Sequence, residues 1–182
     1  MSARKKRPAV PGVAGDVEAM IRVDHAGEYG AVRIYEGQLA VLGNRKSETA
    51  DAIRKMAEQE QEHLAAFDRL VNERRVRPTA LEPVWRVAGF ALGAATALMG
   101  EKAAMACTAA VEEVIDQHYG QQIEKLDGDP ELKESVEKFR ADEIAHKNEA
   151  LERGAEEAPA YKLLSETIKV GCRLAIKLSE RI

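Results

Sequence analysis

The sequence predicts an all-α protein, and three observations support this fold class. Ala, Glu, Leu, Lys and Arg are abundant, whereas aromatic residues make up only 4% of the 182 positions, a composition that favours helices over sheets. Apolar residues recur at helical spacing, and no stretch shows the strict alternation of a half-buried strand. A hydrophobic content of 45% excludes a disordered chain, and a net charge of −4 gives no indication of nucleic-acid binding.

Residues 1–15 are expected to form a flexible basic tail, and residues 16–182 a single helical domain. The tail carries the basic run 4–7 but no apolar segment of the kind found in secretory signals. Cys107 and Cys172 both lie in apolar, helix-like runs. A disulfide framework or a thiolate zinc site is therefore not expected, and a reducing compartment is the default.

The first two helices are predicted over residues 16–42 and 47–72. Asp16 can cap the first helix, and Gly43 terminates it. Ser47 has the side chain of a good cap for the second helix.

A second pair of helices is predicted over residues 101–126 and 130–153. Gly128 separates them, and Asp129 followed by Pro130 is a strong helix start, because the aspartate can cap the helix and proline suits its first turn.

Two further helices, 84–100 and 161–182, are expected in addition to a four-helix core. The first is apolar almost all round, but its uncharged run is shorter than the roughly 20 residues that span a bilayer. Leu92 and Leu98 are expected to contact lipid from this helix. The second is basic and amphipathic, and each of the two either lies on a membrane surface or packs on the bundle.

Each helix of the two predicted pairs places one glutamate in the middle of its apolar face, at about 100° per residue. Two of the helices add a histidine one turn later. Burying an unpaired carboxylate costs several kcal/mol, and these faces contain no Lys or Arg. Two divalent cations would balance four carboxylates, whereas the alternative is a set of core polar residues satisfied by one another. The six residues are Glu28, Glu60, His63, Glu112, Glu143 and His146.

The two halves of the chain repeat this arrangement. Glu112, Glu143 and His146 lie 84, 83 and 83 positions after their counterparts in the first half. One Glu followed by Glu-x-x-His in each helix pair is the ligand set of ferritin-like four-helix bundles that bind two iron or two manganese ions.

Other polar residues near these positions are less specific. His118 and Tyr119 are candidates for supporting the ligands from behind, or are an ordinary helix-surface histidine and a core tyrosine. Asp24 and Asp116 could each hold the second nitrogen of a ligating imidazole, or could be solvated.

Four segments closely resemble the demethoxyubiquinone hydroxylases of ubiquinone biosynthesis: IRVDHAGEYGAVRIYEGQLAVL (21–42), EQEQEHLAAF (58–67), GEKAAMACTAAVEEVIDQHYGQQIEKL (100–126) and DEIAHKNEAL (142–151). The resemblance implies a di-iron monooxygenase that uses O₂ and a two-electron reductant to hydroxylate the last free ring position of a polyprenyl benzoquinol. It implies that the six residues above bind two iron ions, with Glu60 and Glu143 bridging them.

The resemblance also implies partners and a location. The expected partners are the polyprenyl quinol, a membrane surface and a lipid-binding accessory protein, and an exposed apolar helix favours a homo-oligomer or a lipid-bound form. The expected location is peripheral, on the cytoplasmic face of a bacterial inner membrane, or on the matrix face of the mitochondrial inner membrane for a processed eukaryotic chain. The electron source is open between a reductase, direct reduction by a nicotinamide such as NADH, and the quinol itself.

Two other function classes share some of these features. A ferritin- or rubrerythrin-like protein that stores iron or reduces peroxide has the same bundle, but the apolar segment 84–100 and the lack of a rubredoxin-type cysteine pattern argue against it. A membrane-associated helical scaffold without enzymatic activity is the second alternative, and it would bind no iron.

Overall fold

A computed structural model describes residues 13–182, which form six α-helices and one short 3-10 helix and contain no strand. This confirms the predicted all-α class. The basic run 4–7 lies outside the described residues. The helices are α1 (Val13–Leu42), α2 (Glu48–Arg74), α3 (Glu82–Leu98), α4 (Glu101–Ile123), α5 (Pro130–Glu152), η1 (Ala155–Glu157) and α6 (Tyr161–Ser179).

Two of the three predicted caps are present, whereas the cap predicted at Asp16 is wrong, because α1 begins at Val13 and Asp16 lies inside its first turn. The Ser47 hydroxyl accepts a hydrogen bond from the backbone N–H of Ala50 at 3.2 Å, and the Asp129 carboxylate accepts one from that of Leu132 at 3.3 Å. These bonds satisfy N–H groups that would otherwise have no partner at the starts of α2 and α5. The largest differences from the predicted bounds are at three ends: α1 begins at Val13 rather than Asp16, α4 ends at Ile123 rather than Leu126, and α6 ends at Ser179 rather than Ile182.

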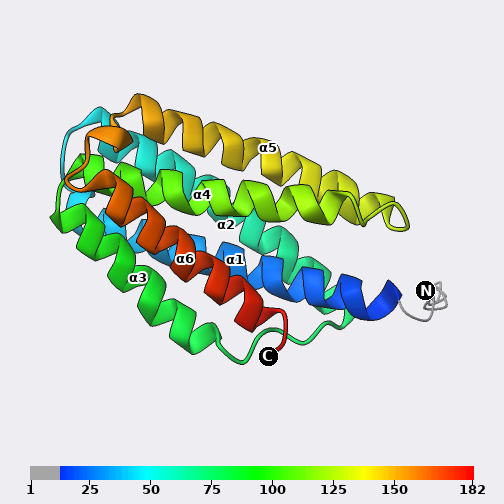
Figure 1. Ribbon diagram of the computed structural model, residues 1–182. Helices are drawn as coiled ribbons and strands as arrows, with labels where there is room; N and C mark the ends of the chain where they lie inside the picture. The colour runs from blue at the N-terminus through cyan, green and yellow to red at the C-terminus, as the bar shows by residue number, and fades with distance from the viewer. Residues whose placement is uncertain (1–12) are drawn as a thin grey trace.

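The helices form a four-helix bundle with two additional helices on one side (Figure 1). Helix α1 packs against α2, and α4 packs against α5, so the bundle consists of the two predicted pairs. Helix α3 lies along α1, and α6 lies along α4.

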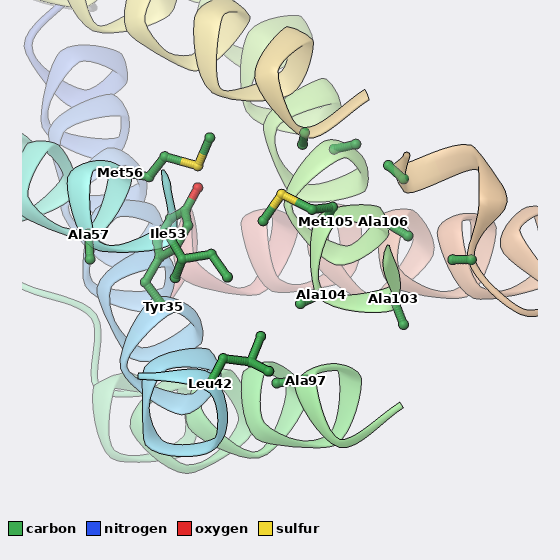
Figure 2. Close-up of a cluster of buried hydrophobic side chains, with 14 residues drawn as sticks. Tyr35, Leu42, Ile53, Met56, Ala57, Ala97, Ala103, Ala104, Met105 and Ala106 are labelled. Carbon is green, nitrogen blue, oxygen red and sulfur yellow. The ribbon is translucent and has the colours of Figure 1, made fainter. Parts of the chain in front are cut away.

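The core has one apolar cluster towards each end of the bundle. Figure 2 shows the first cluster, in which Tyr35 and Leu42 of α1 and Ile53 and Met56 of α2 meet the alanine-rich start of α4. The second cluster includes Ile21, Phe67, Tyr119, Leu132 and Phe139. Along every bundle helix, the predicted ligand residues fall between a residue of one cluster and a residue of the other. The ligands therefore form a polar layer enclosed at both ends by apolar side chains.

Helices α1 and α3 approach each other closely because glycines line their contact. A Cβ at Gly93 would lie 1.9 Å from the carbonyl oxygen of Ile34, and a Cβ at Gly37 would lie 2.2 Å from that of Phe90. Only glycine permits this approach of two backbones. The contact holds the apolar α3 on the outside of the bundle.

Candidate metal centre

The structure brings all six predicted ligand residues together in the middle of the bundle. Each is buried, with at most 3% of its surface exposed. Helices α1 and α4 each contribute one glutamate, and α2 and α5 each contribute a glutamate and, one turn later, a histidine. The helical spacing that places these residues on apolar faces also directs them to one point.

The six residues form two overlapping sets, each with ligand atoms within 4.8 Å of one another. One set is Glu28, Glu60, His63 and Glu143, and the other is Glu60, Glu112, Glu143 and His146. Glu60 and Glu143 belong to both sets. This is the arrangement that two neighbouring cations with two shared carboxylates require.

Buried polar atoms without hydrogen bonds are concentrated at this point. They include both carboxylate oxygens of Glu60 and of Glu143, one oxygen each of Glu28 and Glu112, and the Nδ1 atoms of both histidines. An unpaired buried polar atom is costly, so a group of them facing one another indicates a missing partner. Oxygen and imidazole nitrogen atoms in this combination suit a first-row transition metal.

The other nitrogen of each histidine is held by a residue from the opposite helix pair. His63 Nε2 lies 3.1 Å from Asp142 Oδ2, and His146 Nε2 lies 3.0 Å from Gln59 Oε1. A ring whose Nε2 donates to such an acceptor presents an unprotonated Nδ1 to a metal. Asp142 and Gln59 were not predicted from the sequence, although each comes directly before the glutamate of a Glu-x-x-His motif.

Two tyrosines hold the remaining carboxylates across the bundle. The Tyr35 hydroxyl donates to Glu112 Oε1 at 2.8 Å, and the Tyr119 hydroxyl donates to Glu28 Oε1. Each tyrosine thus supports the glutamate carried by the other tyrosine's helix. Of the two supporting candidates His118 and Tyr119, Tyr119 thus contacts a candidate ligand, and Tyr35 makes the equivalent contact from α1.

Burial and mutual charge shift the pKa values of the six residues strongly. Burial and then the charge of Glu143 raise the pKa of Glu60 and of Glu112 well above the ordinary carboxyl value. Burial alone would also raise the pKa of Glu143, but its contacts with His146 and His63 lower it to about 2. Burial favours neutral His63, yet its contacts with Glu143 and Glu28 raise its pKa to about 11. Protons thus neutralise the cluster when no metal is bound, and two divalent cations would replace them.

The other polar residues considered in the sequence, His118, Asp24 and Asp116, do not contact the six candidate ligands. His118 Nε2 lies 3.2 Å from Asp24 Oδ1, which also accepts a hydrogen bond from Gln122 at 2.7 Å. Asp24 thus supports His118 rather than a ligating imidazole. Asp116 binds Arg140 at 2.8 Å and Lys147 at 3.3 Å, so it joins α4 to α5.

An apolar groove of about 420 Å³ lies next to this centre, between α3 and α6, with α1 and α4 forming its floor. Its lining contains no charged residue. Gly27 and Val111, which line the groove, are direct neighbours of Glu28 and Glu112 in sequence. Leu92, expected to contact lipid together with Leu98, instead lines the groove, whereas 76% of Leu98 is exposed.

The chain is similar to a protein family and to several characterised proteins over most of its length. The profile of the protein family described as "Ubiquinone biosynthesis protein COQ7" matches residues 15–179. A "3-demethoxyubiquinol 3-hydroxylase" of Rhodospirillum rubrum is 54% identical over 183 aligned positions, which cover 100% of this chain and 85% of that protein. Mitochondrial proteins named "NADPH-dependent 3-demethoxyubiquinone 3-hydroxylase" from Dictyostelium discoideum and Homo sapiens are 56% and 53% identical. Their alignments cover 91% of this chain and 77% and 78% of those proteins.

Proposed function

The chain belongs to the family of ubiquinone biosynthesis protein COQ7, and on this basis we propose that it is a di-iron monooxygenase that hydroxylates a demethoxy polyprenyl benzoquinol. The observation that carries the proposal is the pair of overlapping ligand sets, with eight buried ligand atoms that make no hydrogen bond and lie between the two apolar clusters. The reaction consumes the quinol, O₂, two electrons and two protons, and it yields the hydroxylated quinol and water.

Two iron ions would supply O₂ activation and the redox steps of oxygen insertion. Glu60 and Glu143 would bridge the ions, because both belong to both sets. Glu28 with His63, and Glu112 with His146, would complete the two coordination spheres. Iron, rather than another divalent metal, is supported by the family's hydroxylase names and by the carboxylate-rich, two-histidine donor set.

The surrounding residues fix the geometry of these ligands and keep bulk water out. Asp142 and Gln59 orient the two imidazoles, and Tyr35 and Tyr119 each hold one carboxylate oxygen. The apolar clusters at both ends of the layer exclude water, which strengthens electrostatic interactions within it and protects a reactive oxidant.

We propose that the groove between α3 and α6 admits the substrate. Its charge-free lining suits the isoprenoid tail, and its floor passes beside the turns that carry Glu28 and Glu112. A ferritin-like storage protein would have no need of such a groove. The electrons are assigned to a reduced nicotinamide, since the Dictyostelium and human relatives are named as NADPH-dependent. NADH and NADPH should be compared directly.

The rim of the groove is proposed to rest on a membrane. No helix within residues 13–182 is long and apolar enough to cross a bilayer. Large apolar side chains are nevertheless exposed on both α3 and α6, with basic residues among those of α6. The resulting peripheral location would be the cytoplasmic face of a bacterial inner membrane, or the matrix face in a mitochondrion. A lipid-binding accessory protein and a second copy of the chain are proposed as further partners.

Oxygen transfer to the quinol tests the proposed activity. Protein loaded with ferrous iron is given a demethoxy quinol, reduced nicotinamide and ¹⁸O₂, and mass spectrometry should detect a product that contains one ¹⁸O atom. Glu60→Ala should abolish both iron binding and product formation, because it removes a ligand from both sets. Glu62→Ala, at an exposed position of the same helix, is the matched control and should retain both. Iron uptake and peroxide consumption without labelled quinol would favour the ferritin- or rubrerythrin-like alternative.

A further inference from the structure

The glycines around α3 fall into two groups according to the space beside them. A Cβ at Gly37, Gly89 or Gly93 would lie within 3.0 Å of a neighbouring atom, so helix packing requires glycine there. A Cβ at Gly27, Gly30 or Gly171 would meet no atom within 4 Å, and none of these three has a positive φ. Neither packing nor backbone conformation explains the missing side chains at these three helical positions.

The three glycines with free space all line the groove. Gly27 and Gly30 lie on the face of α1 that forms its floor, and Gly171 lies on α6, which forms one wall. Glycine within a helix is less stable than alanine because the unfolded chain loses more freedom on folding. The space that these residues leave open is therefore best explained by what occupies the groove.

The groove lining specifies an apolar occupant. Its two hydroxyl groups are already used within the protein: Ser179 accepts a hydrogen bond from Trp85 Nε1 at 3.0 Å, and Thr167 donates to the carbonyl of Leu163 at 2.7 Å. The thiol of Cys172 is uncharged, because burial raises its pKa to about 11. A chain of methyl-branched isoprene units needs no hydrogen bond, but it needs more width than an unbranched chain.

We propose that Gly27, Gly30 and Gly171 are specificity-determining residues that keep the groove wide enough for the branched polyprenyl tail of the substrate. This inference rests on the proposed function, because that function supplies the tail. A Cβ at these positions would meet no atom within 4 Å, and a longer side chain would extend into the space proposed for the tail. The chain would then keep its structure and lose its preference for tailed substrates.

Quinone binding to the metal-free protein tests the inference directly. Trp85 is the one tryptophan of the chain and lines the groove, so quenching of its fluorescence by a quinone reports occupancy. The probes are a benzoquinone that carries a geranyl tail and the same quinone with a methyl group in its place. The protein should prefer the geranyl probe, and Gly30→Leu and Gly171→Leu should each reduce that preference at least tenfold.

Gly15→Leu is the matched control, because Gly15 lies on α1, is exposed, has open space beside it and is outside the groove. It should retain the preference of the unmodified protein. Thermal unfolding and circular dichroism establish that each variant is folded. If a leucine variant does not fold, Gly30→Ala and Gly171→Ala replace it, with a smaller expected loss of about threefold. Folded variants with an undiminished preference would overturn the inference.

Oxygen transfer separates this inference from the proposed function. With iron-loaded protein, the ratio of kcat/KM for the geranyl quinol to that for the tail-less quinol should fall in the same variants. Labelled product from both substrates with an unchanged ratio would refute the role of the glycines and leave the hydroxylase intact. No labelled product from any substrate, combined with glycine-dependent binding of the tail, would refute the hydroxylase and leave the groove assignment.

Discussion

At the scale of single residues, Asp142 and Gln59 connect the two halves of the candidate centre. Each holds the Nε2 atom of a histidine that belongs to the other helix pair. Both therefore act on the orientation and basicity of an imidazole, although neither belongs to the two ligand sets.

Replacing Asp142 by asparagine is expected to weaken metal binding about 10- to 100-fold, because His63 loses a negatively charged acceptor. Titration of the metal-free protein with ferrous iron under anaerobic conditions measures the change. Asp68→Asn is the control, since Asp68 holds His25 Nε2 in the same way at 3.0 Å and that histidine lies outside both ligand sets. Equal affinities of the two variants would show that support of His63 is unimportant.

The two cysteines are expected to resist alkylation in the folded protein. Burial raises the pKa of Cys107 to about 12 and that of Cys172 to about 11. At pH 8 the reactive thiolate therefore makes up about 10⁻⁴ of Cys107 and about 10⁻³ of Cys172. The rate of alkylation should rise with pH and should not level off below about pH 10. Labelling with iodoacetamide, followed by mass spectrometry, should be at least a hundredfold slower than in urea. Rapid labelling of the folded chain at pH 8 would contradict the raised pKa values of the two thiols.

The positions of the six candidate ligands could be predicted from sequence because each depends on the phase of one helix. A buried glutamate on an apolar face is visible from its neighbours three and four residues away. The bonds from Tyr35 to Glu112 and from Asp142 to His63 join different helices, so no local spacing reveals them. Asp24 illustrates the reverse error, because its spacing suggested a ligand support and its actual partner is His118.

At the scale of secondary-structure elements, the contact between α1 and α3 depends on the absence of side chains. Gly93→Ala is expected to lower the free energy of unfolding by about 1–3 kcal/mol or more, because the new Cβ would lie 1.9 Å from the Ile34 carbonyl oxygen. Urea denaturation measures the loss. Gly15→Ala, at an open position of α1, should instead raise stability by about 0.5–1 kcal/mol. A Gly93→Ala protein as stable as the unmodified one would mean that α3 can move away from α1 at little cost.

The helices themselves were predictable, whereas their packing was only partly so. Ser47 and Asp129 are caps whose side chains act on adjacent backbone, and both were predicted correctly. The 3-10 helix η1 has three residues and no periodic pattern to detect. Helix α4 is apolar on several faces, so its sequence does not tell which face meets α5 and which meets α6. The groove between α3 and α6 depends on that packing, and the sequence indicated only that α3 is apolar and that α6 is basic and amphipathic.

At the scale of the whole molecule, α3 and α6, the two walls of the groove, each present an outer face with large exposed apolar side chains. The exposed fractions are 69% for Val87, 76% for Leu98 and 72% for Leu163. The double substitution Val87→Asp with Leu98→Asp is expected to reduce co-sedimentation with vesicles of phosphatidylglycerol and phosphatidylcholine at least tenfold. Two charges would then have to enter the interface in place of apolar groups.

Ala65→Asp with Ala141→Asp controls for charge, because it adds the same two carboxylates at exposed positions of α2 and α5. This variant should sediment with vesicles like the unmodified protein, and all three proteins should bind the same amount of iron. Equal loss in both double variants would assign the effect to net charge. Equal retention would mean that the face contacts something other than lipid.

The division of the ligands between the two halves of the chain has a consequence for biosynthesis. Helices α1 and α2 supply three members of one set, but the fourth, Glu143, comes from α5, and the other set likewise takes Glu60 from α2. A nascent chain therefore possesses no complete cation site until nearly all of it has left the ribosome. If the proposed iron fills these sites, it would be bound only after the apolar clusters on both sides of them have been synthesised, so the half-made protein would hold no redox-active metal.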